Sequence, residues 1–106
     1  MANAKIINVL KKYMQALHSN GINLEHAFLY GSYARDEASD ESDIDILLVS
    51  DYFDTSDIYK FSKPWRIAAD IDHRIEPVSI ASRRFLMDES SPLIAIIKQE
   101  GVEIEL

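Results

Sequence analysis

The chain has 106 residues, no cysteine, and 11 Lys and Arg residues against 18 Asp and Glu, which gives a formal net charge of −7. It therefore lacks disulfides and thiolate metal sites, and its acidity disfavours contact with a phosphate backbone, so direct nucleic-acid binding is not expected. A hydrophobic content of 47% is typical of one packed domain, taken here as residues 1–106. No apolar run reaches the roughly 20 residues of a membrane span, so we expect no membrane association and a cytoplasmic location.

The N-terminal half predicts one long helix followed by two strands. Apolar residues at helical spacing predict a helix over Ile6–Leu17, which Asn20 and Gly21 then end. Glu25–Tyr30 is typical of a short strand, and Tyr33–Glu37 of one or two helical turns. After a polar loop, the apolar run Ile44–Val49 is the clearest strand in the chain.

The C-terminal half continues the alternation of helices and strands. Asp57–Asp70 predicts a helix in two pieces, because Pro64 suits a first turn capped by Ser62 better than a helix interior. The remaining expected elements are a strand at Ile75–Ile80, a short helix at Arg83–Met87, a helix over Pro92–Glu100 and a half-exposed strand of Val102, Ile104 and Leu106. This order indicates an α/β or α+β fold around one small sheet.

Two acids stand at the start of the strongest strand, in the segment 31–49, GSYARDEASDESDIDILLV. Residues two apart in a strand share a face, so Asp43 and Asp45 project the same way with Cα atoms about 6.5 Å apart. Such a pair repels unless a cation lies between the carboxylates, and hard oxygen ligands suit Mg²⁺ or Mn²⁺. The alternative is a solvated strand end at which acids happen to alternate.

Gly31 and Ser32 lie at the end of the preceding strand. A Gly-Ser turn that enters a helix lets a phosphate approach free backbone N–H groups, with the Ser hydroxyl as a further donor. The alternative is an ordinary helix cap formed by Ser32. A phosphate cradle beside a carboxylate pair favours phosphoryl or nucleotidyl transfer, which depends on positioning and on neutralising oxygen charge.

Other metal and nucleotide motifs do not fit. The acidic loop over residues 36–45 has no Gly for the sharp turn of a calcium-binding EF-hand, and no Walker lysine follows a Gly-rich loop. His18, His26 and His73 are dispersed along the chain without ligand spacing. We interpret these histidines as structural or surface residues.

The segment GSYARDEASDESDIDILL resembles the signature of the DNA polymerase β-like nucleotidyltransferase superfamily. The short chain resembles its minimal nucleotidyltransferase (MNT) branch. This resemblance implies a mixed sheet flanked by helices, an NTP bound with Mg²⁺ (or Mn²⁺), and transfer of an NMP group, AMP from ATP. By position, Gly31 and Ser32 would hold the nucleotide phosphates and Asp43 and Asp45 the metals, while Arg35 is a candidate phosphate contact.

The superfamily also uses a third carboxylate on a later strand. The matching segment here is HRIEPVSI, so the resemblance assigns this catalytic and metal-binding role to Glu76, with Asp72 as the alternative. Glu76 could instead be a surface residue of an edge strand that Pro77 marks. A second departure is Asp36, because the family often has Gly after Ala-Arg.

The MNT branch is similar to one half of two-gene toxin–antitoxin systems. In these, the MNT protein adenylylates a helical HEPN ribonuclease and silences it, so the resemblance implies a HEPN-type toxin partner. The alternative is a catalytically inactive nucleotide-binding or scaffold subunit that neutralises a helical partner by binding.

Overall fold

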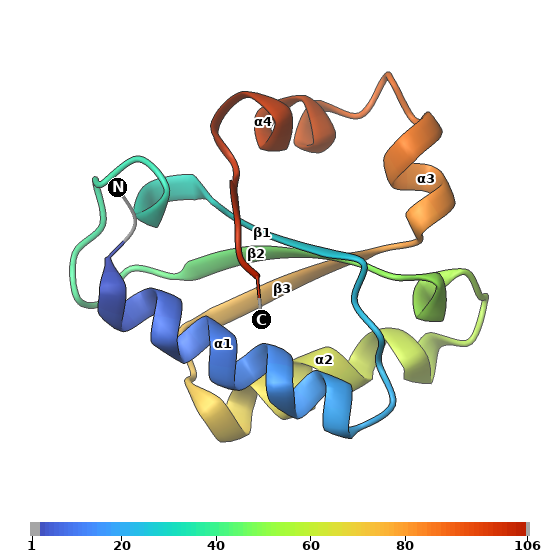
Figure 1. Cartoon of the computed structure of the whole chain (residues 1–106), viewed down its shortest axis with the longest axis horizontal. Coiled ribbons are helices and arrows are strands. Elements are labelled where there is room, and N and C mark those ends of the chain that lie inside the picture. Colours follow the sequence, from blue (N-terminus) through green and yellow to red (C-terminus); the bar gives the residue numbers. More distant parts are fainter. Residues whose placement is uncertain (1–2, 106) are drawn as a thin grey trace.

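Within residues 3–105, which the computed structural model describes, a four-stranded sheet lies between two layers of helices (Figure 1). In chain order the elements are α1 (Ala4–Ser19), β1 (His26–Tyr30), β2 (Ile44–Val49), α2 (Ile58–Ile71), β3 (Ile75–Ile80), α3 (Ser82–Met87), α4 (Pro92–Glu100) and β4 (Val102–Glu103), with 3₁₀ turns at Gly31–Tyr33 and Asp51–Phe53. This architecture confirms the predicted class of a small sheet flanked by helices.

The sheet is mixed, with the strand order β3-β2-β1-β4. Strand β1 pairs antiparallel with β2 and β4, whereas β2 and β3 are parallel. Strand β3 lies at an edge, which agrees with Pro77, because proline cannot donate to a neighbouring strand. The register places Asp45 opposite both Tyr30 on β1 and Glu76 on β3. A single row of side chains therefore crosses three strands.

The two faces of the sheet carry separate apolar clusters. The cluster under α1 and α2 takes alternate residues of β2, namely Ile44, Ile46 and Leu48. The cluster under α3 and α4 includes Leu47, Val49 and Ile97, with Phe28 and Phe85 packed against it. Because side chains alternate along a strand, Asp43 and Asp45 share the α3/α4 face with Leu47.

Helix α2 is continuous, so the prediction of two helical pieces is wrong. Asp57 caps the helix by accepting from the Tyr59 N–H, and Pro64 lies inside it. Ser62 donates to the Tyr59 carbonyl instead of capping a second helix. The buried Pro64 also accepts a hydrogen bond of 2.8 Å at its carbonyl from the Tyr13 hydroxyl of α1. Burial and this bond offset the backbone hydrogen bond that proline cannot make.

The chain ends in a shorter strand than its alternation predicts. Strand β4 comprises Val102–Glu103, although Ile104 is buried and its N–H still bonds to the Ala27 carbonyl at 2.8 Å. Leu106, the last residue of the predicted strand, lies outside the described residues. Across residues 3–105, no helix has both the length and the apolar composition needed to cross a membrane.

Candidate functional site

The row formed by Tyr30, Asp45 and Glu76 is the centre of the candidate site. Asp45 is the Cα partner of Tyr30 on one side and of Glu76 on the other. Directly paired residues in a sheet have Cβ atoms about 4.5–5.5 Å apart, so these side chains are neighbours. Asp43 immediately precedes β2 on the same face. The fold thus brings three of the predicted site residues, Asp43, Asp45 and Glu76, to one patch.

Asp45 is an electrostatically strained member of this patch. Partial burial raises the pKa of its carboxyl, and the carboxylates of Glu76 and then Asp43 raise it further, against a smaller opposing effect of Arg35. Within the described part of the chain, the side chains of Asp43, Asp45 and Glu76 make no hydrogen bond or ion pair with another protein group. Their negative charges are therefore not neutralised by the protein.

Tyr30 shares this environment, and sequence reasoning missed it. Burial, followed by the charges of Asp45 and Glu76, raises the pKa of the Tyr30 phenol to about 12. The phenol is therefore neutral at physiological pH, and a neutral hydroxyl adds no charge to the carboxylate patch. The feature of the sequence that could have identified Tyr30 as a site residue is its position directly before Gly31, at the end of the strand.

The carboxylates offer suitable donors for a hard divalent cation without forming a complete cage. Carboxylate oxygens are the donors that Mg²⁺ prefers, and their mutual repulsion is what a bound cation would relieve. However, no group of three or more His, Asp or Glu side chains in residues 3–105 is arranged closely enough to hold a metal ion. The donor chemistry fits a metal shared with a ligand that supplies further oxygens.

Gly31 forms the closest contact between the Gly-Ser turn and this patch. Its φ of +76° lies in the region that favours glycine. A Cβ atom at this position would overlap Oδ2 of Asp45 and lie 3.3 Å from its Cγ. Glycine therefore lets the Asp45 carboxylate approach the turn more closely than any side chain would allow.

The turn after β1 is shorter than expected. A 3₁₀ turn at Gly31–Tyr33 replaces the predicted helical turns over Tyr33–Glu37, and Asp36 adopts a left-handed φ of 56° that ends the helical path. The N–H groups of Ala34 and Arg35 bond to the Gly31 carbonyl. That of Ser32 has no backbone acceptor among the residues described. The turn thus presents donors to an anion, but without the dipole of a long helix.

Arg35 is tied to two carboxylates. Its Nε lies 3.1 Å from Glu37 Oε1, and its Nη1 lies 3.0 Å from Glu100 Oε1 at the end of α4. These ion pairs connect the loop after the turn to the α3/α4 layer. To contact a phosphate, as the sequence predicts, Arg35 would have to exchange at least one of these partners.

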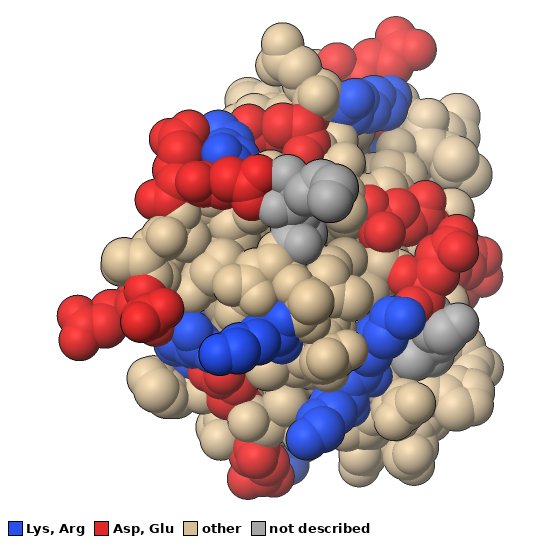
Figure 2. Space-filling view, turned by 60° about the vertical axis from the view of Figure 1, so that its left-hand side comes forward, with Lys and Arg blue, Asp and Glu red and all other residues tan. Residues whose placement is uncertain are grey.

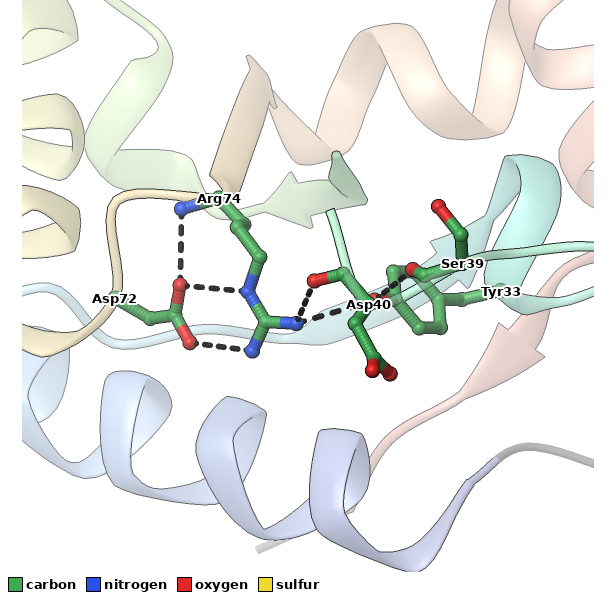
Figure 3. Close-up of polar contacts among 5 residues, drawn as sticks. All are labelled: Tyr33, Ser39, Asp40, Asp72 and Arg74. Atoms are coloured by element: carbon green, nitrogen blue, oxygen red, sulfur yellow. Dashed lines mark hydrogen bonds and ion pairs between the residues drawn. The ribbon is translucent and has the colours of Figure 1, made fainter. Parts of the chain in front are cut away.

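Asp72, the alternative third carboxylate, lies before β3 and is paired with Arg74 (Figure 3). Its Oδ1 and Oδ2 accept from Arg74 Nε at 3.0 Å and Nη2 at 2.7 Å, which lowers the pKa of Asp72. Arg74 Nη1 also donates to the Asp40 carbonyl and the Tyr33 hydroxyl, and Tyr33 in turn donates to the Ser39 carbonyl. The network anchors the loop over 34–43 against the start of β3. Asp72 is thus occupied in a structural ion pair, whereas Glu76 lies beside Asp45.

A search of family sequence models gives the family described as "Polymerase beta, Nucleotidyltransferase", which matches residues 4–104. The chain belongs to this family. The match confirms the resemblance drawn from the motif, and with it a nucleotidyltransferase domain. No curated protein sequence matches the chain.

Several solved structures share this fold. A Sulfolobus solfataricus protein assigned as a nucleotidyltransferase has a TM-score of 0.64 at 19% identity and covers 93% of this chain and 78% of its own. A toxin–antitoxin structure with AMP-PNP has a TM-score of 0.62 at 21% identity, and the match covers 93% of this chain and 72% of the other. A chain in a complex of tri-AMPylated Shewanella oneidensis HEPN toxin with MNT antitoxin has a TM-score of 0.57 at 20% identity. The match covers 92% of this chain and 69% of the other. At these identities the likeness establishes the fold.

Proposed function

We propose that the chain is a metal-dependent nucleotidyltransferase that transfers AMP from ATP to a HEPN-type toxin and acts as its antitoxin. The observation that carries the proposal is the row of Asp45 and Glu76 beside Gly31, at one corner of a nucleotidyltransferase fold. Structures of a HEPN toxin with an MNT antitoxin, and of a toxin–antitoxin with AMP-PNP, support the choice of partner and nucleotide.

Each site residue has a proposed role in this reaction. Asp43, Asp45 and Glu76 would hold Mg²⁺, which when bound neutralises charge on the phosphate oxygens. The Ser32 hydroxyl and the N–H groups of the turn would bind the phosphates on the pyrophosphate side. The acceptor oxygen forms a bond to the α-phosphorus, the bond to the bridging oxygen breaks, and pyrophosphate departs. Glu76 would either complete the metal site on the acceptor side or accept the proton of the acceptor oxygen.

Transfer of labelled AMP to a HEPN-type protein encoded beside this chain tests the proposal. Glu76→Gln should abolish the transfer while ATP binding survives, whereas Asp72→Asn should leave transfer nearly unchanged because Asp72 serves the ion pair with Arg74. The reverse pattern would move the third carboxylate to Asp72. Silencing of the partner without any transfer would replace the enzyme by the alternative function, a subunit that neutralises its partner by binding.

Calorimetry in the absence of a partner tests the nucleotide site separately. ATP should bind appreciably with Mg²⁺ or Mn²⁺ and weakly in EDTA, because the unneutralised acids around Asp45 repel the triphosphate. Equal affinity in EDTA would contradict the site. Asp88→Asn is the matched control, since it removes one negative charge in the segment between α3 and α4 and should change neither titration.

A further inference from the structure

Charge is distributed unequally between the two helical layers. Helices α1 and α2 carry six of the chain's 11 basic residues (Lys5, Lys11, Lys12, Lys60, Lys63 and Arg66) and, with Asp70, one of its 18 acidic residues. The remaining residues thus hold nearly all of the negative charge. In the face seen in Figure 2, red side chains predominate in the upper half and most blue ones lie in the lower half, the level at which α1 runs in Figure 1. The α1/α2 layer is therefore a basic face on an acidic molecule, with the N-cap Asp57 at its edge where α2 begins.

Large apolar side chains are exposed on the same layer. Ile58 is 73% exposed, Tyr59 75% and Trp65 50%, and Phe61 is also exposed. We call Ile58, Tyr59, Phe61 and Trp65 the α2 apolar patch. Ile58, Phe61 and Trp65 follow each other at spacings of three and four residues, so they form one stripe along the helix. Contiguous exposed apolar groups of this size mark interaction sites on folded proteins.

The lysines of α2 lie on the flank of the helix that faces α1, away from this stripe. Lys60 and Lys63 place their Nζ atoms 4.8 and 5.9 Å from the ring centroid of Tyr52, and Lys63 Nζ also donates to the Asn20 carbonyl. Arg66, next to Trp65, is exposed and forms no ion pair in residues 3–105. Because no acid among these described residues pairs with Arg66, its guanidinium is available to an acid of another molecule.

We propose that the outer face of α2 is a docking surface for an acidic, amphipathic segment of a partner protein. Apolar side chains of the segment would cover the α2 apolar patch, and its carboxylates would pair with the exposed Arg66. Aromatic and Arg side chains are the groups that contribute most to protein interfaces. Charge complementarity to the basic face selects an acidic partner.

The docking surface is separate from the candidate functional site. Asp45 and Glu76 face the α3/α4 layer, whereas α2 covers the opposite face of the sheet. The Gly-Ser turn follows the last residue of β1, but α2 begins near the other end of the sheet, after β2 ends at Val49. Both sites can therefore be occupied together, and the inference holds whether or not the proposed nucleotidyl transfer occurs.

Two other occupants fit the observations less well. The net charge of −7 opposes binding of nucleic acid, and a β-branched Ile58 at the most exposed end of the stripe offers no ring for base stacking. A second copy of the chain would have to bring its acidic surface onto a basic face, a head-to-tail contact that leaves both end surfaces open to further copies. An acidic protein segment satisfies both the charge and the apolar stripe.

Trp65 provides a native probe, because it is the single tryptophan of the chain. The titrant is an amphipathic helical peptide of Leu, Glu and Ala, about 20 residues long and without Trp. The control peptide has Gln in place of each Glu. We expect the acidic peptide to shift the Trp65 emission to shorter wavelength at physiological ionic strength, and the Gln peptide to bind about tenfold more weakly.

Variants of the chain localise the effect. Arg66→Glu and Tyr59→Ser should each weaken the acidic peptide about tenfold, whereas the matched changes on the other layer, Lys98→Glu and Leu86→Ser, should not; Leu86 is as exposed as Tyr59 at 75%. Equal affinity for both peptides, or equal loss in all four variants, overturns the proposal. So does tighter binding of a single-stranded oligonucleotide, or a sedimentation equilibrium dimer that Tyr59→Ser dissociates.

Discussion

Gly31 and Asp45 are packed so closely that a methyl group on the first would overlap the carboxylate of the second. The two residues come from opposite sides of the acidic segment, Gly31 from the end of β1 and Asp45 from the start of β2. Their contact brings the Gly-Ser turn and the carboxylate pair to one place. The spacing of the two motifs in the sequence thus follows from an antiparallel pairing that aligns Tyr30 with Asp45.

Replacing Gly31 by Ala should therefore be costly for two separable reasons. The positive φ costs an L-residue about 1–2 kcal/mol, and the overlap with Asp45 adds to it, so we expect a loss of about 2 kcal/mol or more in unfolding free energy. In an Asp45→Ala background the overlap disappears, and the cost of Gly31→Ala should fall by at least about 0.5 kcal/mol. Urea denaturation of the parent protein, the two single variants and the double variant measures both the backbone cost and the cost of the overlap. Additive effects would show that the two residues are not in contact.

Asp36 is the one described residue other than glycine with a positive φ, at 56°, a region of backbone space that favours glycine. Asp36→Gly and Asp36→Ala remove the same side-chain interactions, so their difference isolates the backbone. The free energy of unfolding of the Gly variant should be about 1 kcal/mol higher than that of the Ala variant. Thermal denaturation of both proteins tests this, and equal stability would mean that the loop does not hold residue 36 in the left-handed region.

The ion pair of Asp72 and Arg74 should stabilise the fold above the acid range. Because Arg74 lowers the pKa of Asp72, the ionised carboxylate contributes stability above its unfolded pKa of about 3.9, and this is lost as pH falls through the lower folded value. Asp72→Asn should lose about 1–2 kcal/mol at pH 7 and approach the parent protein near pH 3. Melting curves across this range measure it. A constant difference at all pH values would assign the loss to hydrogen-bond geometry.

The elements set by local pattern were predictable from the sequence, and those set by distant contacts were not. The apolar run Ile44–Val49 has the predicted bounds of β2, and the alternation of strand side chains alone places Asp43 and Asp45 together. Helix α2 runs unbroken through Pro64, which is buried and accepts a hydrogen bond from Tyr13, far away in the chain. Likewise, nothing local to Arg74 shows that it reaches Asp40 and Tyr33.

The candidate site likewise has features that the sequence predicts and features that depend on distant contacts. The motif predicts that Gly31 and the two aspartates belong together, and the strand register adds that Glu76, not Asp72, lies beside Asp45. The ion pairs of Arg35 could not be predicted, since Glu100 comes from a helix whose packing the sequence does not specify. Tyr30 was missed because an aromatic residue before a turn is usually part of the core.

Asp45 should show a pH dependence opposite to that of Asp72. Burial and the neighbouring acids raise its folded pKa, so the ionised carboxylate destabilises the fold, and stability is lost as pH rises from the unfolded value of about 3.9 through the higher folded value. In EDTA at pH 7, Asp45→Asn should be about 0.5–1 kcal/mol more stable than the parent protein. The advantage should vanish near pH 3. Destabilisation at pH 7 instead would mean that the carboxylate makes a structural hydrogen bond.

Addition of Mg²⁺ and ATP should reverse this order. If the acids beside Asp45 hold a metal with the nucleotide, the parent protein alone gains the stability linked to binding, about 2.7 kcal/mol at a hundredfold excess over its dissociation constant. This exceeds the 0.5–1 kcal/mol or so that the substitution gains by relieving repulsion, so the parent protein should then melt at the higher temperature. Asp88→Asn, measured in parallel, should gain as much from Mg²⁺ and ATP as the parent does. If Asp45→Asn gains equally, the nucleotide binds without this carboxylate, and the repulsion at the start of β2 has another cause.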